Sequence, residues 1–205
     1  MPKRVDLELQ RQAIASAAID VITEAGLEGA RLRDVARVAK VTTGAVTHYF
    51  DNKDAVLEAA LEEIVRRTLE RMERVPRPLK PGDVETFVRR VCAYLPIDEE
   101  SQREWRVWLA FWGRAMADPR LRAIHRAHHS KIVDRLIGPL QSLRDPAPPL
   151  SQKQLHRQAD ALIAAIDGVG TRATLEPELW PPKRQRETLA DLLLPMLNAF
   201  IQPGS

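Results

Sequence analysis

Residues 32–50 read LRDVARVAKVTTGAVTHYF, and this stretch decides the fold of the N-terminal part of the chain. Its apolar residues repeat with helical spacing on both sides of a short interruption, which predicts two short helices joined by a tight turn. Ala36 is small enough to let the two helices cross closely, and Thr42 is placed to cap the second one. The stretch therefore predicts a helix-turn-helix, whose second helix fits the major groove of DNA.

Helical periodicity continues through almost the whole sequence, and no segment has the sustained alternation that is typical of a strand. Asn52, Asp83 and Asp118 are each placed to cap a following helix, and Ser101 with Glu104 predicts a capping box. The first four expected helices cover about residues 9–25, 32–39, 43–50 and 53–74, and later ones open near residues 84, 102, 119, 152 and 183. The sequence therefore predicts an all-α fold of about nine helices.

The composition excludes several classes of protein. The chain has 205 residues, 44% of them hydrophobic, and a formal net charge of +3, which is too small to indicate nucleic-acid binding by itself. No apolar run is long enough to cross a membrane, and no apolar signal core follows Met1, so we expect a cytoplasmic protein without a membrane partner. The single cysteine, Cys92, excludes an internal disulfide and a cysteine-based zinc cage. No catalytic constellation or glycine-rich phosphate loop stands out, so we expect neither an enzyme nor a cofactor.

The run VTTGAVTHYFDNK, residues 41–53, followed by a long helix, resembles the DNA-binding domain of the TetR family of bacterial transcriptional regulators. The two preceding helices match the same domain, so this resemblance covers about residues 9–57. The segments from Trp108 to Leu121 and from Ala164 to Ala173 resemble the BetI-type subgroup, which is typified by a choline-sensing repressor. This second resemblance covers about residues 84–200.

The resemblance implies a sequence-specific DNA-binding regulator. Such a protein is a homodimeric repressor that binds double-stranded, palindromic operator DNA and is released by a small-molecule effector. The resemblance divides the chain into a helix-turn-helix DNA-binding domain, residues 1–53 with the motif at about 31–50, and an effector-binding and dimerisation domain, residues 54–205. It assigns the DNA contacts to Arg33, Thr42, Thr43, Ala45, Thr47, His48, Tyr49 and Lys53.

Two positions depart from the family pattern. Lys40 stands in the turn where the family commonly has glycine, so we expect Lys40 to adopt a left-handed backbone conformation at some cost. Thr47 stands where many members have tyrosine. The recognition helix also lacks the Arg, Lys, Asn and Gln side chains that make bidentate contacts to bases. We therefore expect readout through thymine methyl groups, His48 and DNA shape.

Three tryptophans, Trp105, Trp108 and Trp112, follow one another at spacings of three and four residues, which places them on one helix face. Two interpretations stay open: this stripe lines an effector cavity, or it packs in the core. Aromatic faces with a nearby carboxylate suit a quaternary ammonium or another cation. The effector-pocket candidates are Trp105, Trp108, Trp112, His128 and Asp167.

The last two predicted helices carry wide apolar stripes, which suit pairing with a second copy of the chain. The candidates for the dimer interface are Leu162, Ile166, Leu193, Leu197 and Phe200. The alternative interpretation is that these stripes fill the core of the monomer.

A histidine cluster on one predicted helix, His125, His128 and His129, supports a different function. The four-residue spacing of His125 and His129 suits a shared metal ion. The alternative function is therefore a helical metal-binding protein or enzyme. No third type of ligand follows at a telling spacing, so we predict no metal site.

Overall fold

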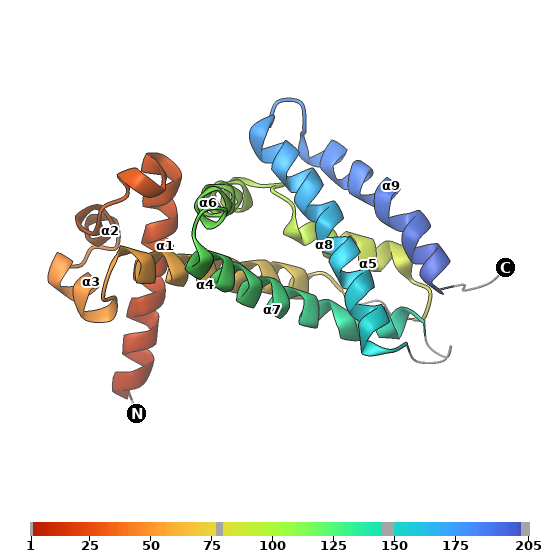
Figure 1. Ribbon diagram of the computed structural model, residues 1–205, viewed down its shortest axis with the longest axis horizontal. Helices are drawn as coiled ribbons and strands as arrows, with labels where there is room; N and C mark the ends of the chain where they lie inside the picture. Colours follow the sequence, from red (N-terminus) through yellow and green to blue (C-terminus); the bar gives the residue numbers. More distant parts are fainter. Residues whose placement is uncertain (1, 77–79, 145–149, 202–205) are drawn as a thin grey trace. The chain divides into compact units, whose positions relative to one another are not determined.

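The computed structural model describes residues 2–76, 80–144 and 150–201, and the side chains from residue 7 onward (Figure 1). These residues form nine α-helices and one short 3₁₀-helix without any strand, which confirms the all-α prediction. The helices are α1 (Pro2–Gly29), α2 (Leu32–Val38), α3 (Thr43–Tyr49), α4 (Lys53–Arg74), α5 (Val84–Val91), α6 (Glu99–Ala115), α7 (Pro119–Leu143), α8 (Gln152–Leu175) and α9 (Pro182–Ile201), with the 3₁₀-helix η1 (Cys92–Tyr94) after α5.

The chain packs into two compact units. The first unit contains residues 1–67 and 103–125, and the second unit contains residues 68–102 and 126–205. Three helices, α4, α6 and α7, contribute residues to both units. The predicted division between residues 53 and 54 concerns function rather than compactness, and it stays a prediction.

The core of the first unit is formed by α1, α4 and α6, with α2 and α3 packed against it. Ile14, Leu61 and Phe111 are fully buried in this core. Val35 and Val46 attach the two short helices to it. Helices of seven residues are marginal in water by themselves. Buried apolar contacts, rather than intrinsic helix propensity, therefore hold α2 and α3 in place.

The second unit is organised around α9, which packs against both α5 and α8. Figure 1 shows α8 and α9 running side by side in opposite directions. At the turn between them, the ring of Trp180 lies 5.4 Å from the guanidinium carbon of Arg172 and 4.5 Å from that of Arg184. Trp180 is buried, so its stacking between two arginines stabilises the connection of the two helices.

Three predicted helix caps are confirmed. The amide oxygen of Asn52 accepts a hydrogen bond from the backbone of α4, and the carboxylates of Asp83 and Asp118 do the same for α5 and α7. Each of these bonds satisfies a backbone N–H group that has no partner within its own helix. The sequence therefore located the starts of these three helices correctly.

The predicted capping box of Ser101 with Glu104 is wrong. The helix α6 begins at Glu99, and Asp98 is its cap, because the Oδ1 of Asp98 accepts a hydrogen bond from the N–H of Ser101 at 2.8 Å. The hydroxyl of Ser101 accepts a bond from the N–H of Asp98 at 3.1 Å in return. Asp98 and Ser101 are both good capping residues, and the pattern of residue types alone did not separate them.

Three further boundaries differ from the sequence pattern. The helix α1 begins at Pro2, earlier than the predicted start near residue 9, although Gly26 interrupts it with a φ of 69° as a helix stop should. Pro139 and Pro195 predict a kink or an end of the helix. Neither proline ends its helix, since α7 and α9 both continue past them.

The turn between α2 and α3 depends on Lys40, whose φ of 55° lies in the left-handed region, as expected. The N–H of Val41 donates to the carbonyl of Ala36 at 2.9 Å, and the N–H of Lys40 donates to that of Arg37 at 3.3 Å. These two bonds form a Schellman cap, in which the left-handed position usually holds glycine. Lys40 therefore carries a steric cost that glycine would avoid.

Replacing Lys40 with glycine should stabilise the protein relative to Lys40→Ala. Both variants lose the same charge, but only alanine keeps the Cβ atom that crowds a left-handed backbone. We expect a difference of roughly 0.5–1 kcal/mol in the free energy of unfolding, measured by urea titration with circular dichroism. Equal stability of the two variants would show that the turn carries no such strain.

Candidate functional site

The predicted recognition helix, α3, has one buried face and one exposed face. Thr42 caps it as predicted, since its Oγ1 accepts a hydrogen bond from the N–H of Ala45 at 3.0 Å. Val46 is fully buried and anchors the inner face. Thr43, Thr47 and His48 are exposed on the outer face. A capped short helix with an exposed polar face is the arrangement that reads a DNA groove in helix-turn-helix proteins.

The residues around α3 differ in how far they are open to a partner. Arg33 is exposed on α2, whereas Ala45 is half-buried on α3. The hydroxyl of Thr47 donates to the backbone carbonyl of Gly44 at 3.1 Å, within its own helix. That bond leaves the Thr47 methyl group as its apolar contact surface.

Two of the predicted DNA-binding residues, Tyr49 and Lys53, hold partners within the chain. The hydroxyl of Tyr49 donates to the Oε1 of Gln10 in α1 at 2.8 Å. The Nζ of Lys53 donates to the backbone carbonyl of Glu28 at 3.1 Å. Both contacts are solvent-exposed; the first connects α3 to α1, and the second connects the start of α4 to the end of α1. These contacts hold the hydroxyl of Tyr49 and the ammonium of Lys53 at the edge of the DNA-binding head, by which we mean α1, α2, α3 and the start of α4.

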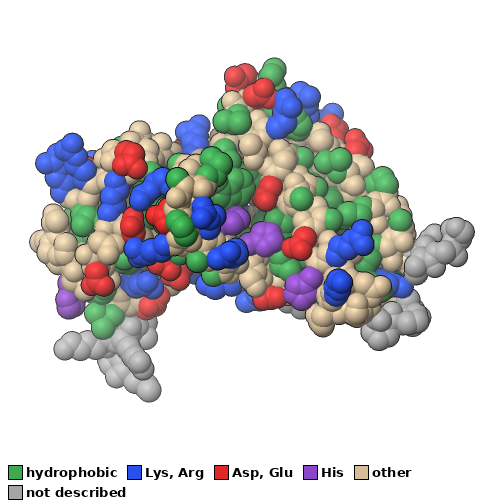
Figure 2. Space-filling model, viewed as in Figure 1, with side chains coloured by type: hydrophobic (Ala, Val, Ile, Leu, Met, Phe, Trp, Pro, Cys, Tyr) green, Lys and Arg blue, Asp and Glu red, His purple; other side chains and the backbone are tan. Residues whose placement is uncertain are grey.

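The segment formed by α2 and its flanking turns carries a local excess of positive charge. Four basic residues are exposed there: Arg31, Arg33, Arg37 and Lys40. The acidic residue of the same segment, Asp34, is half-buried. On the face shown in Figure 2, Lys and Arg side chains alternate with acidic ones, in keeping with the small net charge. The local excess on α2 suits the phosphate backbone of DNA.

The first turn of α4 is fixed to α6 and α7 by ion pairs within the first unit. The carboxylate of Asp54 lies 3.4 Å from the guanidinium of Arg114 and 3.7 Å from that of Arg120. Asp54 directly follows Lys53, the predicted phosphate-binding residue. These pairs therefore hold the start of α4 in a defined position beside the head.

A second anchor of α4 surrounds Glu63, whose side chain is only 5% exposed. Its Oε1 accepts hydrogen bonds from Arg66 at 2.6 Å and from Arg67 at 2.7 Å. Arg67 also donates to the hydroxyl of Ser16 in α1 at 2.6 Å. Burial raises the pKa of Glu63, but the hydrogen bonds and charges of the two arginines outweigh it and hold the pKa below its usual value. The cluster stays ionised and ties α4 to α1.

The three tryptophans of α6 form an aromatic cluster with His125 inside the first unit. The ring of Trp112 lies 6.2 Å from Trp105, 6.3 Å from Trp108 and 6.0 Å from His125. Trp105 is buried, whereas Trp108 and Trp112 keep part of their surface exposed. The Nε1 of Trp112 is buried without a hydrogen-bond partner among the described residues. We call Trp105, Trp108, Trp112 and His125 the aromatic cluster.

The remaining effector-pocket candidates lie in the second unit. His128 is buried on α7, and Asp167 is half-buried on α8. The structure thus brings the three tryptophans together and assigns His128 and Asp167 to the other compact unit. Within the described ranges, no group of three or more His, Cys, Asp or Glu side chains is arranged to hold a metal ion.

Comparisons with known proteins decide between the two functions that the sequence left open. The family model described as "BetI-type transcriptional repressor, C-terminal" matches residues 84–198, and the model for "Bacterial regulatory proteins, tetR family" matches residues 14–60. The chain belongs to the TetR family of bacterial transcriptional regulators, in its BetI-type group. The metal-binding or enzymatic alternative is not favoured.

Individual relatives agree with this assignment. The HTH-type transcriptional regulator BetI of Paraburkholderia phytofirmans is 30% identical, over 89% of this chain and 91% of that protein. The protein of the same name from Paraburkholderia xenovorans is 29% identical, over 94% of this chain and 96% of its own length. A crystal structure of a transcriptional regulator from Rhodococcus sp. RHA1 is 31% identical, with a TM-score of 0.77 over 95% of this chain and 99% of that one.

A more distant relative with a similar fold has been solved with a bound ligand. A regulator from Saccharomonospora viridis, solved in complex with choline, has a TM-score of 0.72 at 21% identity, over 90% of this chain and 95% of that one. Regulators of the TetR family bind operator DNA and act as dimers. No helix in the described part of the chain is long and apolar enough to cross a membrane.

A TetR-family dimer needs an exposed face, and the predicted interface residues do not provide one. They are buried within a single chain, where α9 packs against α5 and α8: Leu162, Ile166, Leu193, Leu197 and Phe200. This corrects the sequence-based assignment of the stripe. Apolar residues at helical spacing predict a buried face, but they do not say whether the chain itself or a partner covers it.

The helices α8 and α9 also have an exposed apolar face, formed by other residues than the buried stripe. On α8 it consists of Ala161, Ala164, Gly168 and Leu175, and on α9 it consists of Leu192, Pro195 and Ala199. Both series repeat at spacings of three, four or seven residues, which places each on one side of its helix. Most residues of this face are small, so they contribute little to an apolar pattern in the sequence.

The carboxyl group of Asp167 should make the free energy of unfolding of this TetR-family protein depend on pH. Burial raises the pKa of its carboxyl from 3.8 to about 6, so the folded protein binds this proton more tightly than the unfolded chain. The free energy of unfolding therefore falls as the pH rises from about 4 to about 6, and this loss stays constant above it. Asp167→Asn removes the loss and should raise the free energy of unfolding by roughly 2 kcal/mol at pH 8, and by much less at pH 4.

The measurement is a urea titration at several pH values and one fixed protein concentration. Asp160→Asn is the matched control, because Asp160 is an exposed carboxylate of the same helix. A stability gain in Asp167→Asn that does not depend on pH would contradict the assigned cause.

Proposed function

We propose that this TetR-family regulator is a repressor that binds a palindromic operator as a homodimer and leaves it when a small organic cation binds. The observation that carries the proposal is the exposed face of α3, where Thr43, Thr47 and His48 project from a helix capped by Thr42. Two copies related by two-fold symmetry would place their recognition helices in successive major grooves, about 34–36 Å apart.

In this proposal, α3 recognises bases through threonine methyl groups and one histidine ring rather than through long polar side chains. The methyl groups of Thr43 and Thr47 suit contact with the methyl group of thymine, and His48 offers a ring nitrogen to a base edge. His48 also packs edge-on against Tyr49, with ring centroids 5.4 Å apart, which restricts its orientation. Few bidentate contacts are available, so DNA shape would contribute much of the specificity.

Phosphate contacts would come from groups at the edge of the head. Arg33 and Thr42 are exposed, and the polar atoms of Tyr49 and Lys53 reach the surface. Each of the last two would share or exchange its internal partner, Gln10 or the Glu28 carbonyl, for a phosphate oxygen. Such contacts position the protein on DNA without reading its sequence.

Lys53→Ala should weaken binding to all DNA sequences alike, because it removes one phosphate contact. The slope of log affinity against log salt should become shallower by about one unit. The measurement is fluorescence anisotropy with the DNA upstream of the gene and with an unrelated duplex. Lys80→Ala removes an exposed charge from the second unit and is the control whose slope should stay unchanged. An unaltered slope in Lys53→Ala would remove this residue from the interface.

For the dimer we propose the exposed apolar face of α8 and α9. Gly168 and Ala164 have no bulky side chain, so a partner helix can approach the backbone of α8 closely. Leu175 and Leu192 are 70% and 52% exposed, and each continues the exposed apolar series of its helix. An exposed apolar patch, rather than one exposed leucine, is typical of an interaction site. A partner subunit that covers this face would account for both leucines.

The effector that we propose is a quaternary ammonium or a similar organic cation. The faces of Trp108 and Trp112 attract a cation through the ring quadrupole, and both side chains keep exposed surface. The unpartnered Nε1 of Trp112 can donate to a hydroxyl or carboxylate of the same ligand. The choline bound to the regulator from Saccharomonospora viridis supports this class of ligand.

Choline should lower the affinity of the wild-type protein for its operator, and Trp108→Leu should raise the choline concentration needed by tenfold or more, about 1.4 kcal/mol. Trp108→Phe is the matched control, because it keeps an aromatic face at the same position. The readout is operator binding by fluorescence anisotropy at increasing choline.

A neutral analogue separates charge from shape in the same experiment. 3,3-Dimethyl-1-butanol has the shape of choline without its positive charge, and it should have little effect on operator binding. Equal responses to choline and to this alcohol, or equal responses of Trp108→Leu and Trp108→Phe, would refute the cation-binding role of the aromatic cluster.

A further inference from the structure

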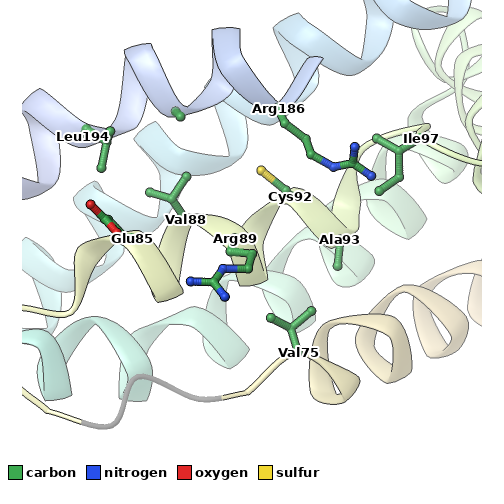
Figure 3. Close-up of a pocket in the computed structure, with 10 residues that line it drawn as sticks. Val75, Glu85, Val88, Arg89, Cys92, Ala93, Ile97, Arg186 and Leu194 are labelled. Atoms are coloured by element: carbon green, nitrogen blue, oxygen red, sulfur yellow. The ribbon is translucent and has the colours of Figure 1, made fainter. Parts of the chain in front are cut away.

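A cavity of about 490 Å³ lies within the second unit, apart from every residue assigned above to DNA, effector or dimer (Figure 3). Its walls come from the chain after α4, from α5 with η1, and from α9. The apolar lining includes Val88, Ala190 and Leu194. Cavities of about 300–1,000 Å³ hold ordinary small-molecule ligands. The volume and the apolar lining therefore suit a compact organic molecule.

The charged groups of this cavity are unevenly placed. Arg186 from α9, and Arg89 and Glu85 from α5, line it. Figure 3 shows Glu85 near Leu194 and Arg186 on the side of Ile97, so these two groups lie toward different ends of the lining, whereas Arg89 follows Glu85 by one turn of α5. Two arginines against one carboxylate leave an excess of positive charge.

Neither arginine is neutralised within the described part of the chain. Arg186 and Arg89 make no ion pair and no hydrogen bond with any described residue. Arg186 lies close enough to Cys92 for its charge to act on the thiol. Burial nevertheless raises the pKa of Cys92 to about 11, so the thiol stays neutral and does not balance Arg186. Both arginines are exposed to solvent, and Arg186 is available to pair with an anionic group that enters the cavity.

We propose that this cavity binds a small amphipathic carboxylate, with its carboxylate on Arg186 and its apolar body along Val88, Ala190 and Leu194. A guanidinium binds a carboxylate through two parallel hydrogen bonds, which fixes the end of the ligand. A cation is disfavoured by the two arginines, and a neutral apolar molecule leaves Arg186 without a counter-charge. The proposal is independent of the aromatic cluster and of DNA binding.

Octanoate is the probe, and binding to the full-length protein is measured by calorimetry, with 1-octanol as the neutral analogue of equal chain length. Octanoate should bind at least tenfold more tightly than 1-octanol. Arg186→Gln should weaken octanoate binding about tenfold and leave 1-octanol unchanged, and Arg89→Gln should have a smaller effect of the same kind. Lys131→Gln, which removes an exposed charge of α7 in the same unit, is the matched control and should bind octanoate like the wild type.

The single cysteine gives a second readout that locates the ligand. Cys92 lines the cavity, so bound octanoate should slow its modification by methyl methanethiosulfonate several-fold in the wild type and not in Arg186→Gln. Ala190→Phe places a phenyl ring in the cavity and should weaken octanoate binding while operator binding persists.

Three outcomes would overturn the proposal. The first is octanoate binding that does not change in Arg186→Gln, and the second is unchanged Cys92 reactivity at saturating octanoate. The third is a change of oligomeric state in Ala190→Phe with octanoate binding retained, which would identify the cavity as an interface between copies of the chain.

Discussion

The close crossing of α2 and α3 is the constraint on which the DNA-binding function depends. It is set by a turn with Lys40 in a left-handed conformation, by Ala36 at only 2% exposure, and by Val46, which is fully buried. A larger residue at Ala36 would push the helices apart, and a polar one at Val46 would bury an unsatisfied group. Because α3 has only seven residues, its outward face has no other means of orientation. The exposure of Thr43, Thr47 and His48 is thus a consequence of packing on the opposite side.

The same core joins the head to the aromatic cluster. Val35 and Val46 belong to one continuous set of buried residues with Phe111, and Trp108 and Trp112 pack against that set. The first unit therefore contains both the proposed DNA surface and the proposed cation-binding side chains. Protein cores are densely packed and transmit strain rather than absorb it. A cation bound at the tryptophans, as proposed above, would act on the core that also holds α3, and the ion pair of Asp54 with Arg114 links α4 to the helix that carries these tryptophans.

The sequence predicted local structure well wherever one residue type has one physical role. Thr42 and Asn52 were recognised as caps because a side-chain acceptor before a helix has few other uses. The left-handed conformation of Lys40 was expected from the family resemblance, because the family commonly has glycine at this position. The start of α6 was misplaced because Asp98 and Ser101 both satisfy the capping pattern, and only the fold selects between them. The interface stripe on α8 and α9 was assigned to the wrong environment, since helical periodicity reports burial and not what causes it. The cluster of Glu63, Arg67 and Ser16 was not predicted at all, because its members lie on two helices far apart in the sequence.

The small side chains of the recognition helix also explain why this fold needs a second copy. Thr43, Thr47 and His48 offer at most a few base contacts, and a single head with a net charge near zero gains little from the phosphate backbone. Two linked heads double the contacts and convert the second binding event into an intramolecular one. That gain requires a stable link between the two copies, which the proposed apolar face on α8 and α9 would supply. In the proposed dimer, the exposed leucines of the second unit would therefore compensate for the few base contacts that α3 offers.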